Sequence, residues 1–364
     1  MEDANLPFQP IRGSLYSSAE LLAGFRFDDP RSLADTPDFQ SYRYFVKEGR
    51  AVSRSPYASM MQALHDNSIL RAMWQFLDGT TRPVVAIMGG ASSVVRGDAN
   101  FANTARIASK LSNAGFLVAS GGGPGAMEAT HLGALLAGKP ASAIDDAVGL
   151  LAAQAKLPDG ILNIVAKDGT IDWPLVEACH KWAEPAVRLM QQNPDGGPSL
   201  GVPTWHYGHE PLSPLASHVS KYFANSIRED VLLGLATNGI VFTEGRAGTM
   251  QEVFQDAAQN YYASDEQPFA PMVFFGKAFW KERLGVHNVL ESLFKLGGPE
   301  RKAKYDALSC FTDDVDEVVD FLQRNLPTKE QRMHRLDVLG FSGVMLEAAR
   351  ANAAVLSAVD RSRV

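Results

Sequence analysis

The apolar positions predict a series of buried strands, each followed closely by glycine. The run VVAIMGG (Val84–Gly90) is apolar throughout and ends in two glycines, as is typical of a strand buried on both faces. The segment FLVASGGG, residues 116–123, repeats this arrangement. Apolar runs at residues 199–205, 240–244 and 271–276 predict three further strands.

Helical periodicity alternates with these strands. Residues 100–115 have helical spacing and end at Gly115, a residue that commonly terminates helices. Residues 217–239 are interpreted as one long helix, residues 247–262 as another, and residues 313–326 as a late amphipathic helix. Alternating strands and helices imply right-handed βαβ connections, so we expect an α/β fold with a doubly wound, mostly parallel, Rossmann-like sheet.

Three parts of the chain fall outside this alternation. Residues 1–80 predict a helical N-terminal extension, with an irregular loop at residues 26–40 between helical segments. The nucleotide-binding domain is then expected over residues 81–328, interrupted by a mostly helical insertion at residues 139–198. The Ala-, Leu- and Val-rich residues 329–364 predict a C-terminal helix.

Composition narrows the class of protein. With 364 residues, 46% of them hydrophobic and 21% charged, the chain has the balance of a globular protein. A net charge of −7 argues against a general nucleic-acid binder, although a local basic pocket could still hold one phosphate. Cys179 and Cys310 show no metal-ligand spacing, and the start of the chain lacks the features of a signal peptide. We expect a cytoplasmic protein with no metal, no cofactor and no membrane or nucleic-acid partner.

Three glycine-rich loops directly follow predicted strands, at residues 89–93, 121–125 and 245–249. Because ligands bind at the carboxyl ends of parallel strands, the loops should share one edge of the sheet. Glycine lets backbone N–H groups approach a ligand, and the helix N-terminus that follows favours an anion. The loops therefore predict a phosphate or nucleotide pocket, with these candidate binding residues: Gly90, Ser92, Gly121, Gly122, Gly123, Gly245, Arg246, Gly248 and Thr249.

The third loop is followed by a carboxylate. If a helix begins near Ala247, Thr249 lies in its first turn and Glu252 lies about one turn farther on. A carboxylate so close to a phosphate site is unsuited to binding the phosphate, because like charges repel. It could instead face the sugar and stabilise an oxocarbenium-like transition state, as in glycoside hydrolysis. The alternative is a capping or helix-surface glutamate.

The segment TWHYGHEPLSP also follows a predicted strand and should overhang the same pocket. His206 and Tyr207 are candidate base contacts, since their rings can stack on a base or form hydrogen bonds with it. Packing within the loop is an equally open interpretation. A metal site built from His206, His209 and Glu210 is not supported by their spacing.

NAD-linked chemistry is a less favoured interpretation. Gly121, Gly123 and Ala126 satisfy the spacing of the dinucleotide fingerprint. They follow the second strand, however, and no acidic residue clearly ends the next one. Asp145 and Asp146 lie near the expected distance but fall in a helical pattern.

The motifs SGGGPGAME and EGRAGTMQE resemble the GGGxxGLM and PGGxGTxxE signatures of the LOG family. These cytokinin riboside 5′-monophosphate phosphoribohydrolases were formerly mislabelled as lysine decarboxylases, and they are related to bacterial nucleotide 5′-monophosphate nucleosidases. The resemblance covers about residues 84–138 and 199–326. It implies a Rossmann-like fold, a homodimer or higher homo-oligomer, and hydrolysis of a nucleoside monophosphate to free base and ribose 5-phosphate.

The resemblance also implies two catalytic residues. Glu252 matches the catalytic carboxylate of the signature, and Arg228 stands one residue farther from the loop than the family's arginine. Two positions depart from the signature: Glu244 replaces its proline and adds negative charge, and Arg246 replaces its second glycine and adds a Cβ. The sequence thus predicts a nucleoside 5′-monophosphate N-glycosidase, with a non-catalytic nucleotide-binding or sensing protein of the same fold as the alternative.

Overall fold

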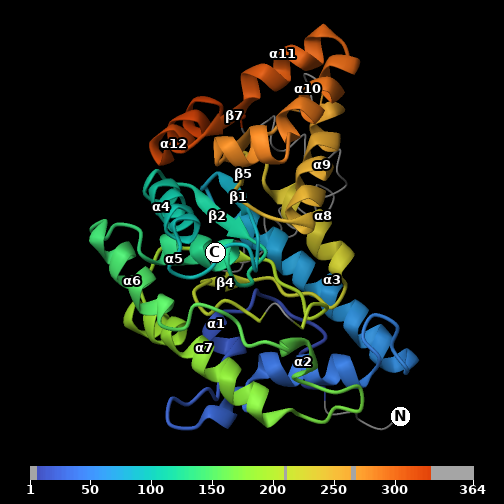
Figure 1. The fold of residues 1–364 in the computed structure, drawn as a ribbon. Helices are drawn as coiled ribbons and strands as arrows, with labels where there is room; N and C mark the ends of the chain where they lie inside the picture. Colours follow the sequence, from blue (N-terminus) through green and yellow to red (C-terminus); the bar gives the residue numbers. More distant parts are fainter. Residues whose placement is uncertain (1–5, 209–210, 264–267, 329–364) are drawn as a thin grey trace, which may run out of the picture.

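A seven-stranded parallel sheet forms the centre of the molecule (Figure 1). The computed structural model describes residues 6–208, 211–263 and 268–328. In these residues the strands are ordered β4-β3-β2-β1-β5-β6-β7, and all neighbouring pairs are parallel. Their bounds are β1 Val84–Met88, β2 Leu117–Ser120, β3 Ser199–Gly201, β4 His218–Val219, β5 Ile240–Phe242, β6 Met272–Phe275 and β7 Ser309–Thr312. The predicted α/β class and the doubly wound, Rossmann-like sheet are therefore confirmed.

The strand order reverses at β1. Strands β2 to β4 lie on one side of it and β5 to β7 on the other. The connection from β4 to β5 therefore carries the chain back across the sheet, and β1 and β5 become neighbours. The register pairs Val84 with Leu117 and Met88 with Phe242, which brings the ends of β1 and β5 level. A reversal of this kind leaves a crevice beyond the carboxyl ends of the strands, where open α/β sheets bind their ligands.

Helices cover both faces of the sheet, so the central strands β1, β2 and β5 are buried at every position. Along β1, Val85 and Ile87 face one core and Ala86 and Met88 face the other, as the alternation of a strand requires. The helices between and after the strands are α4 Ala99–Asn113, α5 Ala126–Leu135, α8 Asn225–Leu235, α9 Ala247–Tyr261, a π-helical turn Phe279–Arg283, α10 Val286–Leu296, α11 Pro299–Leu308 and α12 Val315–Arg324.

The N-terminal segment and the insertion lie side by side below the sheet (Figure 1). The N-terminal helices are α1 Ser18–Leu21, a 3-10 helix Pro30–Asp35, α2 Pro37–Lys47 and α3 Pro56–Asp78. Those of the insertion are α6 Ser142–Ala152, a 3-10 turn Ile161–Asn163 and α7 Trp173–Gln192. Arg31 and Glu177 form an ion pair of 2.8 Å between the two parts. The C-terminal helix predicted for residues 329–364 lies outside the described residues.

Two elements differ from the sequence prediction. The prediction of one long helix over residues 217–239 is wrong. Its first residues form β4, which pairs with β3 so that His218 lies opposite Leu200. The helix begins only at Asn225. The loop expected at residues 26–40 instead contains the 3-10 helix and the start of α2. Each of those helices opens with a capping side chain followed by proline, a sequence signal for a helix start.

Further elements were not predicted at all: strand β7 and helices α10 and α11. None of the helices in the described ranges combines the length and apolarity needed to cross a lipid bilayer. Cys179 and Cys310 are both free and buried.

Candidate functional site

The three glycine-rich loops meet at the crevice between β1 and β5. Gly90 connects them, since its N–H donates to the carbonyl of Glu244 and its own carbonyl accepts from the N–H of Ala126. The second loop ends at Gly125, whose φ is +70°. A Cβ built on Gly125 would lie 2.4 Å from the carbonyl oxygen of Gly90, so both the backbone conformation and the space require glycine.

A cleft of about 350 Å³ opens where the loops meet, a volume in the range of small-molecule sites. Eight of the predicted site residues line it: Gly90, Ser92, Tyr207, Arg228, Arg246, Gly248, Thr249 and Glu252. The other predicted residues are not among those that line it: Gly121, Gly122, Gly123, Gly245 and His206. Gly245 packs against the side chain of Thr249, and Gly122 packs against Pro203. A Cβ built on Gly121 would lie 3.6 Å from Nη1 of Arg228.

The N-terminus of α9 forms one wall of the cleft. The helix starts at Ala247, so Thr249 stands in its first turn, as predicted. Its N-cap residue Arg246 makes no capping hydrogen bond with its side chain. The first amides of a helix have no partners within the helix, and the helix dipole adds partial positive charge at this end. This wall is therefore suited to an anionic group such as a phosphate.

Arg228 and Glu252 face each other across the cleft. Nη1 of Arg228 lies 3.9 Å from Oε1 of Glu252, beyond the separation of about 2.7–2.9 Å that a direct charge-assisted hydrogen bond takes. Arg228 is 7% exposed, and its Nε makes no hydrogen bond within the described part of the chain. Since Arg228 comes from α8 and Glu252 from α9, the packing of the two helices sets their separation.

The start of α8 is held by a residue from the N-terminal segment. Asp66, buried on α3, accepts hydrogen bonds from the amides of Phe223 at 2.9 Å and Ala224 at 2.8 Å. Ala224 is the N-cap of α8, and its own side chain cannot cap a helix. His65 contacts the same carboxylate at 3.1 Å. Asp66 thus anchors the backbone at the entry to α8, one turn before Arg228.

The two candidate base contacts differ in position. Tyr207 lines the cleft, with the guanidinium of Arg228 5.8 Å from the centre of its ring. His206 does not line it and packs edge-on against Tyr207 at 5.0 Å. Burial, followed by the charge of Arg50, lowers the pKa of His206, which favours a neutral imidazole. His209 and Glu210 lie outside the described residues.

Neither departure from the LOG signature stands at a positive φ. Arg246 has a φ of −114°, an ordinary value for a residue with a Cβ, and its exposed side chain lines the cleft. Glu244 does not line the cleft. Its carboxylate lies beside Gly276, which follows β6: a Cβ built on that glycine would be 3.8 Å from Oε1. The carboxylate of Glu244 therefore lies near the end of β6, outside the lining of the cleft.

The acidic residue of a dinucleotide site is not at a strand end. Asp145 and Asp146 lie within α6, where Asp145 forms an ion pair of 2.5 Å with Arg106. Strand β3, the next strand after the Gly121 loop, ends at Gly201. The part of the chain that the structure describes contains no group of three or more His, Cys, Asp or Glu side chains suited to hold a metal ion.

The insertion contributes to the cleft, a role that no sequence motif predicted. Leu157 follows α6 and lines the cleft together with residues of the glycine loops. Its segment is anchored by Arg96, whose guanidinium donates to the carbonyls of Gln154 at 3.2 Å and Trp182 at 2.7 Å. Arg96 also forms a two-pronged ion pair with Glu128, with N–O distances of 2.6 and 2.7 Å.

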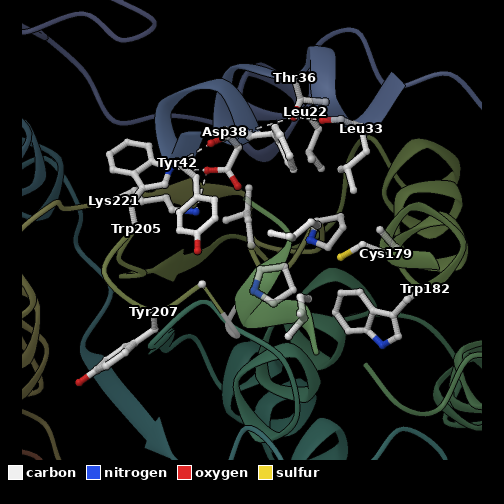
Figure 2. A pocket seen from close by; sticks show the side chains of 18 of the residues that line it. Leu22, Leu33, Thr36, Asp38, Tyr42, Cys179, Trp182, Trp205, Tyr207 and Lys221 are labelled. Atoms are coloured by element: carbon white, nitrogen blue, oxygen red, sulfur yellow. Dashed lines mark hydrogen bonds and ion pairs between the residues drawn. The ribbon is translucent and has the colours of Figure 1, made fainter. Parts of the chain in front are cut away.

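A second cavity, shown in Figure 2, lies between the N-terminal segment and the insertion. Its volume is about 70 Å³, too small for a nucleotide, and its walls are mostly apolar. At one side of the cavity Lys221 and Asp38 form an ion pair of 2.6 Å. The indole N–H of Trp205 donates to the same carboxylate at 2.9 Å. Tyr207 lies at the edge of this cavity and lines the larger cleft as well.

No protein-family model and no curated protein sequence matches this chain. The interpretation of the cleft therefore depends on its own geometry and on the resemblance of the two motifs.

Proposed function

We propose that the cleft binds a nucleoside 5′-monophosphate and that the protein hydrolyses its N-glycosidic bond. The observation that carries this proposal is the pairing of Arg228 and Glu252 at 3.9 Å beside the N-terminus of α9. The site thus offers donors for a phosphate and a carboxylate for a developing positive charge. The resemblance of both motifs to the LOG family supports the same reaction.

In the proposed reaction the 5′-phosphate binds the first amides of α9, the hydroxyl of Thr249 and the guanidinium of Arg246. Charge-assisted hydrogen bonds contribute about 1.5–3 kcal/mol each, so two or three of them give binding in the millimolar to micromolar range. Glu252 then faces the ribose, and Arg228 orients the substrate. As the bond from C1′ to the base nitrogen breaks, the carboxylate stabilises the ribosyl cation. Water adds its hydroxyl to C1′, and its proton leaves with the base.

Chromatography after incubation with AMP, GMP, CMP, UMP and IMP tests the proposal directly. The matching nucleosides and NAD serve as controls, because they lack the terminal 5′-monophosphate that the α9 wall is proposed to hold. We expect free base and ribose 5-phosphate from at least one monophosphate and none from its nucleoside. Binding of a monophosphate without release of base would favour a nucleotide sensor instead.

A further inference from the structure

The cleft has a second carboxylate, Glu229, whose position points to the base of the substrate. Glu229 follows Arg228 on α8 and lines the cleft. Its Oε1 accepts a hydrogen bond of 2.6 Å from Nδ2 of Asn225, and its Oε2 accepts one of 3.0 Å from Nε2 of Gln251. Two amide groups on two helices thus fix the carboxylate in place.

The same arrangement places an aromatic ring beside the carboxylate. Nδ2 of Asn225 also donates to the hydroxyl of Tyr207 at 3.0 Å, so Asn225 holds Tyr207 and Glu229 together. A nucleobase is recognised by stacking on such a ring while its edge forms hydrogen bonds. A carboxylate has about four acceptor positions, and two are used by Asn225 and Gln251. The remaining positions can accept N–H donors from a base edge.

We propose that Glu229 selects nucleotides whose base carries an exocyclic amino group over those with an oxo group or hydrogen at that position. This inference rests on the proposed function of the cleft. An amino group donates to the carboxylate, whereas an oxo group places two acceptors against each other and leaves both without a donor. Three pairs of nucleotides differ in this group: AMP and IMP, GMP and IMP, and CMP and UMP. GMP and IMP differ in the amino group alone, whereas in the other two pairs the ring nitrogen beside the oxo group also carries a hydrogen.

The contact of Glu229 with Gln251 also joins α8 to α9, so helix packing must be separated from base recognition. The next residue, Asp230, provides a matched control. Its Oδ1 accepts a hydrogen bond of 2.8 Å from Nε2 of Gln255, which joins the same two helices with the same chemistry. Asp230 is exposed and does not line the cleft. Glu229→Gln and Asp230→Asn therefore remove the same charge from the same pair of helices.

The test measures kcat/KM for all five monophosphates with the unmodified protein and both variants. In at least one of the three pairs the unmodified protein should prefer the amino base by about 10- to 100-fold. Glu229→Gln should reduce that preference to less than threefold, because its amide can donate to an oxo group, and Asp230→Asn should keep it. Equal rates within every pair in the unmodified protein, or the same loss in both variants, would overturn the inference while leaving the proposed hydrolysis intact.

Equilibrium binding separates this inference from the proposed function. Calorimetric titration with the same monophosphates reports the preference for an amino base even if no base is released. The inference would be supported, even if the protein releases no base, by tighter binding of the nucleotide with the amino base. That preference should disappear in Glu229→Gln and remain in Asp230→Asn. Absence of binding by any monophosphate would overturn both proposals.

Discussion

Glu252 is the residue on which the proposed chemistry most directly depends. Glu252→Gln keeps the size of the side chain and removes the negative charge that faces Arg228. Loss of one electrostatic contact to a transition state lowers kcat by about 100- to 1,000-fold, so we expect a loss of that size. Release of base from the preferred monophosphate gives kcat, and titration shows whether the nucleotide still binds. Unchanged kcat would remove Glu252 from the mechanism.

His131 couples stability to pH. Its ring is fully buried and contacts the hydroxyls of Ser120 and Ser199 at 2.9 Å each, joining β2, α5 and β3. Burial lowers its pKa to about 3, against about 6.5 in an unfolded chain. The unfolded state therefore binds a proton as pH falls below about 6.5 while the folded state does not. The stability that the neutral ring provides is complete above that pH and is lost progressively toward pH 3.

At pH 5 this difference amounts to about 2 kcal/mol of lost stability. The measurement is the change in Tm between pH 7.5 and pH 5.0 for the unmodified protein and for His131→Asn, which has no titrating ring. We expect the variant to be less stable at pH 7.5 but to lose less on acidification. An equal drop in both proteins would show that His131 does not titrate on unfolding.

Among the elements, the entry to α8 links the N-terminal segment to the cleft. Asp66 accepts from two amides at the start of the helix, and Arg228 lies one turn farther on. Asp66→Ala leaves both amides without an acceptor and should cost about 1–3 kcal/mol of stability. Fraying of this turn would also displace Arg228, so we expect a higher KM for the monophosphate. Asp66→Asn keeps one acceptor oxygen and should be affected less in both measurements.

The sequence predicted the elements whose local pattern agrees with their final environment. Strand β1 is apolar because both of its faces are buried, and Gly115 ends α4 with a φ of +92°. The prediction of a helix over residues 217–239 failed because the first of these residues are buried by segments that are distant in the sequence. Val219 lies against β3 and Tyr16, contacts that helical periodicity cannot reveal. Strand β7 was missed because it lies at the edge of the sheet and its sequence, Ser-Cys-Phe-Thr, lacks the continuous apolar run of the central strands.

The candidate site was predictable where one segment supplies it. Thr249 and Glu252 share one helix, so spacing alone places them on the same face of α9, about one turn apart. Their surroundings depend on other segments. Leu157 comes from the insertion and Asp66 from α3, and only the folded chain brings them to the cleft and to α8. A single sequence carries no signal for such long-range contacts.

At the scale of the whole molecule, a buried ion pair ties the insertion to the sheet. Arg96 and Glu128 are 2% and 0% exposed in their side chains, and their carboxylate and guanidinium form two parallel hydrogen bonds. The guanidinium also lies 3.9 Å from the ring of Trp182 on α7. The pair therefore connects the loop after β1, helix α5 and the insertion, which together form the side of the cleft near Leu157.

Glu128→Gln should be strongly destabilising, since it leaves Arg96 buried without a countercharge. Removal of one partner from a buried pair costs about 3–5 kcal/mol, against less than about 1 kcal/mol for an exposed pair. The exposed pair of Glu184 and Arg188 on α7, with an N–O distance of 2.7 Å, provides the matched control variant Glu184→Gln. Thermal denaturation of both variants compares the two costs.

A double-variant cycle shows whether the cost comes from the unpaired charge. Combining Arg96→Leu with Glu128→Leu removes both charges, and the double variant should be more stable than the two single losses added together would allow. Recovery should be incomplete, because the carbonyls of Gln154 and Trp182 lose their donor. We also expect the double variant to have a higher KM for the monophosphate than the unmodified protein, because the segment that carries Leu157 is no longer anchored. Additive losses would mean that the two side chains stabilise the molecule independently, and that the insertion is held by other contacts.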